Sequence, residues 1–100
     1  MAQQRKVIWD IEALKALANL LEWISNKPPL QAEKVEEEIL KRIEILKAQP
    51  ERFPPDKYKR NNKGTYRAFE THSYRITYVY SKKEVQIIHV RHVKREPKEY

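Results

Sequence analysis

The sequence predicts a single α+β domain over residues 1–100, in which an N-terminal helical hairpin packs on one face of a small antiparallel sheet of about three to four strands. Apolar residues recur at three- and four-residue spacing in the first half, which is typical of helices. In the second half the apolar period shortens to two, which is typical of strands. The segment between the two halves holds three of the six prolines and the only glycine. These observations predict two kinds of element joined by one irregular connection.

A short strand and a helical hairpin are expected in the first half, the hairpin over about residues 10–48. The strand covers residues 6–9, and Asp10 is suited to cap the helix behind it. That helix, over about residues 10–25, carries an apolar stripe formed by Leu14, Leu17, Leu21 and Ile24. It stops before Pro28 and Pro29, because proline lacks an N–H and its ring clashes with the preceding turn. A second helix over about residues 30–47 has an apolar face formed by Val35, Ile39, Ile43 and Leu46.

A proline-rich loop over about residues 50–64 leads into the sheet, which is expected over about residues 65–94, with a short tail at 95–100. Three consecutive antiparallel strands are expected at residues 66–71, 74–80 and 85–93, since these segments are rich in β-branched and aromatic residues. The loop also carries four basic residues that either hold phosphates or keep the loop solvated: Lys57, Lys59, Arg60 and Lys63.

The two faces of the sheet follow from the alternation of side chains along each strand. We expect the helices to cover the side that carries Ile76 and Val90, with Ile88 on that same side. The open side is then expected to carry Arg75, His89 and Arg91, and the alternation of the last strand places Ile87 on that side with them. Arg67 of the preceding strand is expected to join this open face.

Charge divides unevenly along the chain. Residues 1–50 have a net charge of 0, whereas residues 51–100 carry the entire excess of +7. Such an asymmetry favours a polyanionic partner for the second half, either nucleic acid or an acidic protein segment. The alternative is a basic surface that serves solubility.

Several function classes are excluded or disfavoured by composition. The absence of cysteine excludes a disulfide framework and a thiolate metal site. No apolar run approaches the roughly 18 residues of a membrane span, and the N-terminus lacks the apolar region of a signal peptide, so we expect a cytoplasmic protein with no membrane partner. The histidines lack the spacing of metal ligands, and neither a metal ion nor a small-molecule cofactor is expected.

The remaining chemistry lies in basic and aromatic groups on and around one sheet face. Cleavage of RNA without a metal needs a proton acceptor, a proton donor and cations that stabilise the developing charge on the phosphate. Arginine, lysine, histidine and tyrosine supply these roles. The alternative is that the strand arginines are solvated and that the tail serves solubility.

The order and spacing of the motifs resemble the RelE/ParE superfamily of type II toxin–antitoxin toxins over about residues 7–98. The resemblance rests on the helical hairpin, the proline-rich loop, Tyr66-Arg67-x-Phe69, Tyr74-Arg75-Ile76-x-Tyr78, Ile87-Ile88-x-Val90-x-His92 and Arg95-x-Pro97. It implies a RelE/ParE-like fold and a toxin that a cognate acidic antitoxin neutralises.

The resemblance implies two activities, and both stay open. RelE-like members cut mRNA on the ribosome, which makes Arg75 the candidate phosphate-stabilising residue, Arg67 a second basic catalytic residue, and His92 or Tyr100 the acid–base group. ParE-like members bind DNA gyrase without catalysis, and the long hairpin is closer to that branch. A third hypothesis is a non-toxic nucleic-acid-binding module. The candidate nucleic-acid-binding residues are Lys57, Lys59, Arg60, Lys63, Arg91, Lys94 and Arg95.

Overall fold

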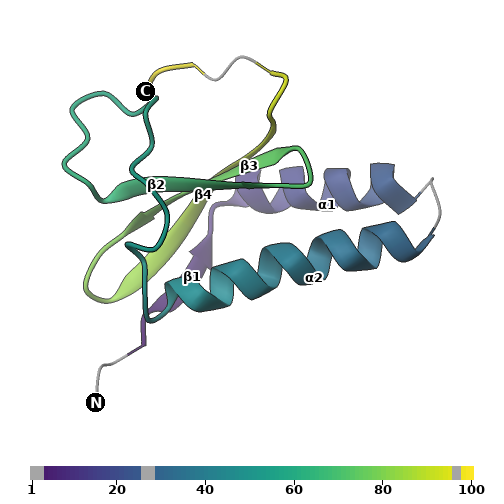
Figure 1. Ribbon diagram of the computed structural model, residues 1–100, viewed down its shortest axis with the longest axis horizontal. Coiled ribbons are helices and arrows are strands. Elements are labelled where there is room, and N and C mark those ends of the chain that lie inside the picture. The colour runs from purple at the N-terminus through teal and green to yellow at the C-terminus, as the bar shows by residue number, and fades with distance from the viewer. Residues whose placement is uncertain (1–3, 26–28, 96–97) are drawn as a thin grey trace.

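The structure is a computed structural model that describes residues 4–25, 29–95 and 98–100. The described elements follow the predicted order, each within one or two residues of its predicted ends (Figure 1). In chain order they are β1 (Lys6–Trp9), α1 (Ile11–Ser25), α2 (Pro29–Leu46), β2 (Tyr66–Thr71), β3 (Tyr74–Tyr80) and β4 (Glu84–His92).

Local chemistry explains where both helices begin. The carbonyl of Asp10 accepts the hydrogen bond of Leu14 N at 2.9 Å, and its carboxylate accepts one from Gln86 Nε2 on β4. The second helix begins at Pro29, a first helical position where the missing N–H costs nothing. Pro28, the other proline expected to stop the first helix, lies outside the described residues.

The four strands form one sheet with the order β1-β4-β3-β2. The pairs β2–β3 and β3–β4 are antiparallel, as predicted for consecutive strands. The first strand pairs with β4 in the parallel direction, so the sheet is mixed. A parallel pair needs a long crossover connection, and the helical hairpin lies within that connection.

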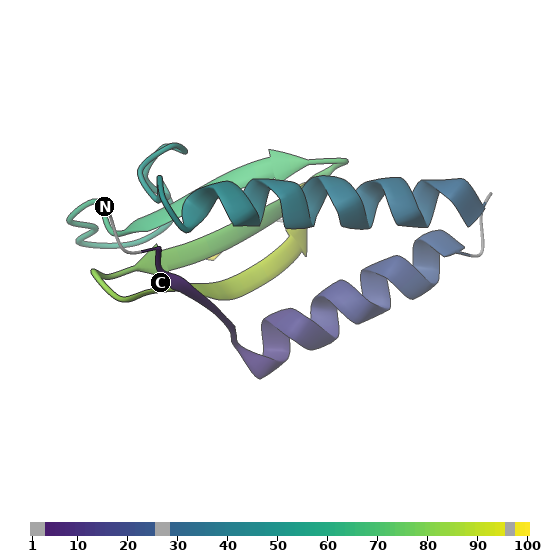
Figure 2. The same ribbon diagram turned by 90° about the horizontal axis from the view of Figure 1, so that it is seen from below.

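Both helices cover one face of this sheet, and Figure 2 shows them on that side. The core between the layers is closed by apolar side chains of both helices and of β2, β3 and β4, among them Leu17, Leu20, Ile39, Ile43, Leu46, Phe69, Ile76, Tyr78, Val85, Ile87 and Val90. Arg42 of α2 reaches β2, where its Nη1 donates to Glu70 O at 3.3 Å. Within the described residues no helix is both long and apolar enough to cross a membrane.

A bulge in β4 changes the predicted faces. Thr77 pairs with His89 and Tyr78 pairs with Ile87, so Ile88 is an extra residue without a partner on β3. The prediction that Ile88 faces the core and Ile87 the open side is therefore wrong. Ile87 is fully buried in the core.

The expectation that Arg67 lies on the open face is also wrong. Arg67 pairs with Tyr78, and Phe69 pairs with Ile76. Directly opposed residues share a face, so Arg67 lies on the helix-covered side with the core residues. Arg75 pairs with Arg91 on the other side of the sheet.

Candidate functional site

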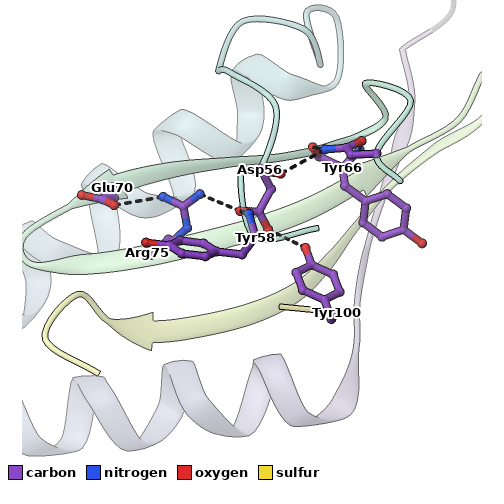
Figure 3. Close-up of polar contacts among 7 residues, drawn as sticks. Asp56, Tyr58, Tyr66, Glu70, Arg75 and Tyr100 are labelled. Atoms are coloured by element: carbon purple, nitrogen blue, oxygen red, sulfur yellow. Dashed lines mark hydrogen bonds and ion pairs between the residues drawn. The ribbon is translucent and has the colours of Figure 1, made fainter. Parts of the chain in front are cut away.

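The open face of the sheet is organised around Arg75, the second residue of β3. Its Nη2 lies 2.8 Å from Asp56 Oδ1, and its Nη1 lies 2.9 Å from Glu70 Oε2. The guanidinium also lies over the ring of Tyr58, with 5.1 Å between Cζ and the ring centroid. Figure 3 shows the guanidinium held between the two carboxylates. The charge of Arg75 is thus neutralised within the fold.

Asp56 supplies the buried end of this network, with only 1% of its side chain exposed. The loop places it there because Asp56 N donates to Tyr66 O at 2.8 Å, while Pro55 forms a bridge with Arg67. Its carboxylate also accepts a hydrogen bond from Tyr58 N at 3.1 Å. Burial alone would raise the pKa of the Asp56 carboxyl, but hydrogen bonds from Tyr100 and Arg75 outweigh burial and hold that pKa below its usual value.

Tyr100 fastens the end of the described chain to the same carboxylate. Its hydroxyl donates to Asp56 Oδ2 at 2.6 Å. Its N–H donates to Tyr58 O at 3.1 Å, and its carbonyl accepts from Arg60 N at 2.7 Å. Burial and the hydrogen bond to Asp56 raise the pKa of the Tyr100 hydroxyl far above its usual value. The hydroxyl is therefore neutral at physiological pH.

His89 completes the ring of aromatic groups on this face. Its ring lies edge-on to that of Tyr100, with 5.0 Å between the centroids. Burial and the neighbouring charge of Arg91 lower the pKa of His89, so the imidazole is neutral at pH 7. Arg75, His89 and Tyr100 line a cavity of about 40 Å³. Known small-molecule pockets measure about 300–1,000 Å³, so this cavity admits water but no nucleotide.

Arg67 and His92, two of the predicted catalytic residues, make other contacts. Arg67 donates to three backbone carbonyls, Gly64 O at 2.8 Å, Phe53 O at 2.8 Å and Glu51 O at 3.3 Å. It therefore ties the loop to β2. The ring of His92 lies edge-on to Tyr74 with 5.0 Å between centroids, and its Nδ1 accepts from Lys94 N at 3.1 Å.

The seven predicted nucleic-acid-binding residues fall into two groups. The first lies around Tyr100, since Lys59 Nζ donates to Tyr100 O at 3.3 Å and Arg91 lines the small cavity with Tyr100. Lys57, Arg60 and Lys63 belong to the same loop as Lys59 and are exposed. The second group lies elsewhere: Lys94 and Arg95 line a cavity of about 580 Å³ that Trp23 of α1 also lines.

Arg75 and Tyr100 were predicted from the sequence as site residues. Three residues that contact them were not predicted: Asp56, Tyr58 and Glu70. The turn signal Pro54-Pro55-Asp56 was present in the sequence, yet nothing in it pointed from Asp56 to an arginine 19 residues away. Glu70 was detectable, because Glu70 and Arg75 flank a short hairpin turn and pair across it.

This network of ion pairs and hydrogen bonds is suited to stabilising the fold and to forming a binding surface. Efficient proton transfer needs groups whose pKa lies near the operating pH, whereas the pKa values of Tyr100 and Arg75 are raised and that of His89 is lowered. Across the described ranges, no three histidine or carboxylate side chains gather as a metal site would require.

The model of the family described as "ParE toxin of type II toxin-antitoxin system, parDE" matches residues 7–97. A solved structure of a chromosomal ParDE toxin–antitoxin system from P. aeruginosa has a similar fold, with a TM-score of 0.69 and 16% sequence identity over 91% of this chain and 98% of that chain. Among curated proteins no sequence match was found. A family match over nine-tenths of the chain, together with the hairpin on a four-stranded mixed sheet, shows that this chain belongs to the family of ParE toxins of type II toxin–antitoxin systems, in which the toxin is paired with an antitoxin.

Proposed function

We propose that this toxin arrests growth by binding DNA gyrase rather than by cleaving mRNA. The observation that carries the proposal is the state of Arg75, whose guanidinium is paired with the carboxylates of both Asp56 and Glu70. A phosphate-stabilising arginine must offer its charge to the substrate. The second predicted arginine, Arg67, lies on the opposite face of the sheet and is bound to backbone carbonyls.

The helical hairpin supports a binding function. Large apolar side chains on both helices are exposed rather than packed into the core: Ile11 is 68% exposed, Leu14 51% and Leu40 45%. Ile11 and Leu14 lie three residues apart, so they share one face of α1, and neighbouring exposed apolar side chains are typical of protein interaction sites. We therefore propose that gyrase contacts the helical hairpin.

The test is a supercoiling reaction with purified gyrase and the refolded toxin, freed of antitoxin by denaturation. We expect loss of supercoiling or accumulation of cleaved DNA. Leu14→Gln should weaken inhibition at least tenfold, because it removes apolar contact area without touching the core. Val93→Gln is the matched control, since Val93 is an exposed apolar residue outside the hairpin. Full activity of Leu14→Gln, or no inhibition by the wild type at any concentration, contradicts the proposal.

Ribosome-dependent cleavage of mRNA is the second candidate, because two predicted catalytic residues, Arg75 and Tyr100, meet at Asp56. The 5′ ends of a defined mRNA should be mapped in a reconstituted translation reaction with and without the toxin. We expect no new ends. New ends within codons that appear only during translation would replace the gyrase proposal with the nuclease one.

A further inference from the structure

Six basic side chains lie on the loop that contacts Tyr100, on β4 and on the segment next to Tyr100. We call this set the basic rim: Lys57, Lys59, Arg60, Lys63, Arg91 and Lys98. Among the described residues, the ion pairs involve Lys15, Arg42, Lys47 and Arg75 but no member of the basic rim. The carboxylates of Asp56 and Glu70 are taken by Arg75. No ion pair of the described residues therefore neutralises the positive charge of the rim.

The backbone that carries the loop part of the rim is held in place by Asn62. Its Oδ1 accepts from Gly64 N at 2.9 Å, and its Nδ2 donates to Tyr66 O at 2.7 Å and to Asp56 O at 3.2 Å. Gly64 has a φ of 102°, a conformation that favours glycine. The end of the chain adds a hydrogen bond from Arg60 N to Tyr100 O at 2.7 Å, and Figure 1 shows the C-terminus beside this loop. A loop held in this way loses little conformational entropy when it binds.

Aromatic rings lie beneath the cations of the rim. Lys59 Nζ lies 4.9 Å from the ring centroid of Tyr66 and 5.3 Å from that of Tyr100. The two rings also contact each other edge-on, with 6.0 Å between centroids. Lys59 already contacts both rings, so a base that stacked at this position would have to displace its ammonium group. We therefore expect the rim to recognise a ligand by its charge.

We propose that the basic rim binds the phosphate backbone of duplex DNA. Clustered lysine and arginine side chains without sequence-reading neighbours neutralise phosphates and release counterions. An acidic protein segment would find little apolar surface to contact beside the rim. The cavity beside the rim is only about 40 Å³, and the exposed large apolar side chains lie on β1, on the two helices and at Val93.

The test is fluorescence anisotropy of a labelled 20-base-pair duplex with the refolded toxin, repeated between 50 and 200 mM salt. Contact with four phosphates gives a slope of log affinity against log salt of about −3.6, a loss of roughly 150-fold over this range. The triple variant Lys57→Gln/Arg60→Gln/Lys63→Gln should reduce the magnitude of that slope by about 2.7.

The matched control is Lys15→Gln/Lys34→Gln/Lys41→Gln, which removes the same charge from exposed positions on the two helices. It should keep the wild-type slope. Equal slopes for the two triple variants would overturn the proposal, because binding would then follow net charge and not the rim. Equal competition per charge by polyglutamate would overturn it too, and tighter binding of a single strand of the same length would contradict recognition of the duplex.

The proposal is independent of gyrase, since this assay contains none. A toxin that inhibits gyrase but fails the salt test refutes only the rim. A toxin that binds duplex DNA through the rim but leaves supercoiling intact refutes only the gyrase proposal.

Discussion

Replacing Asp56 by asparagine tests the network at the centre of the open face. Asparagine keeps the shape, and its amide oxygen can still accept from Tyr58 N, but the amide NH2 in place of Oδ2 cannot accept from the Tyr100 hydroxyl. Arg75 also loses a carboxylate 2.8 Å away. Breaking a fully buried ion pair costs about 3–5 kcal/mol. Arg75 keeps Glu70, and its side chain is 15% exposed. We therefore expect a cost at the low end, about 3 kcal/mol.

A loss of about 3 kcal/mol is large for a domain of this size, whose free energy of unfolding is about 5–15 kcal/mol. It corresponds to a fall in Tm of roughly 12–24 °C. Urea unfolding at pH 7, followed by the fluorescence of Trp9 and Trp23, measures the change without adding salt. The control is Glu70→Gln, which breaks the ion pair of Arg75 with a half-exposed carboxylate and should cost less than about 1 kcal/mol.

The pH dependence gives an independent check on Asp56. Its pKa is lower in the fold than in the unfolded chain, so the unfolded chain binds the proton more readily. The stabilisation is then complete above about pH 4, the usual aspartate range, and is lost as pH falls through the lower folded pKa. The gap between wild type and Asp56→Asn should shrink below pH 4. A variant within about 0.5 kcal/mol of wild type at pH 7, or a gap that does not change with pH, would refute this account.

Three further predictions concern the fold. Ser73→Gly should raise the free energy of unfolding by about 1 kcal/mol, since Ser73 has a φ of 68° in the β2–β3 turn; an unchanged urea midpoint would contradict it. Tyr78→Phe should cost about 1–2 kcal/mol, because the buried Tyr78 hydroxyl donates to Pro50 O at 2.5 Å; thermal unfolding measures this loss. Arg67→Met should lower stability while leaving growth arrest per folded molecule unchanged, and lost toxicity with intact stability would return Arg67 to the list of active groups.

Much of this fold could be predicted from residue patterns alone. The helical stripes, the prolines and the β-branched segments located all six elements, because each depends on neighbours within a few residues. The short β2–β3 turn at residues 72–73 was also predicted from the neighbouring residues. The excess charge of the second half was likewise a property of the chain itself.

The arrangement of the site depended on contacts between segments that lie far apart in the sequence. The β4 bulge at Ile88 reversed the assignment of Ile87, since one extra residue interrupts the alternation and the side chains before it lie on the face opposite to the one expected from the residues after it. Strand pairing placed Arg67 on the covered side and Arg75 on the open side. The carboxylate that neutralises Arg75 comes from a loop 19 residues away, and the tyrosine that shares it comes from 44 residues away. Residue types thus determined the elements and the charge of this toxin, whereas tertiary contacts between distant segments decided which of its cations are paired and which are exposed.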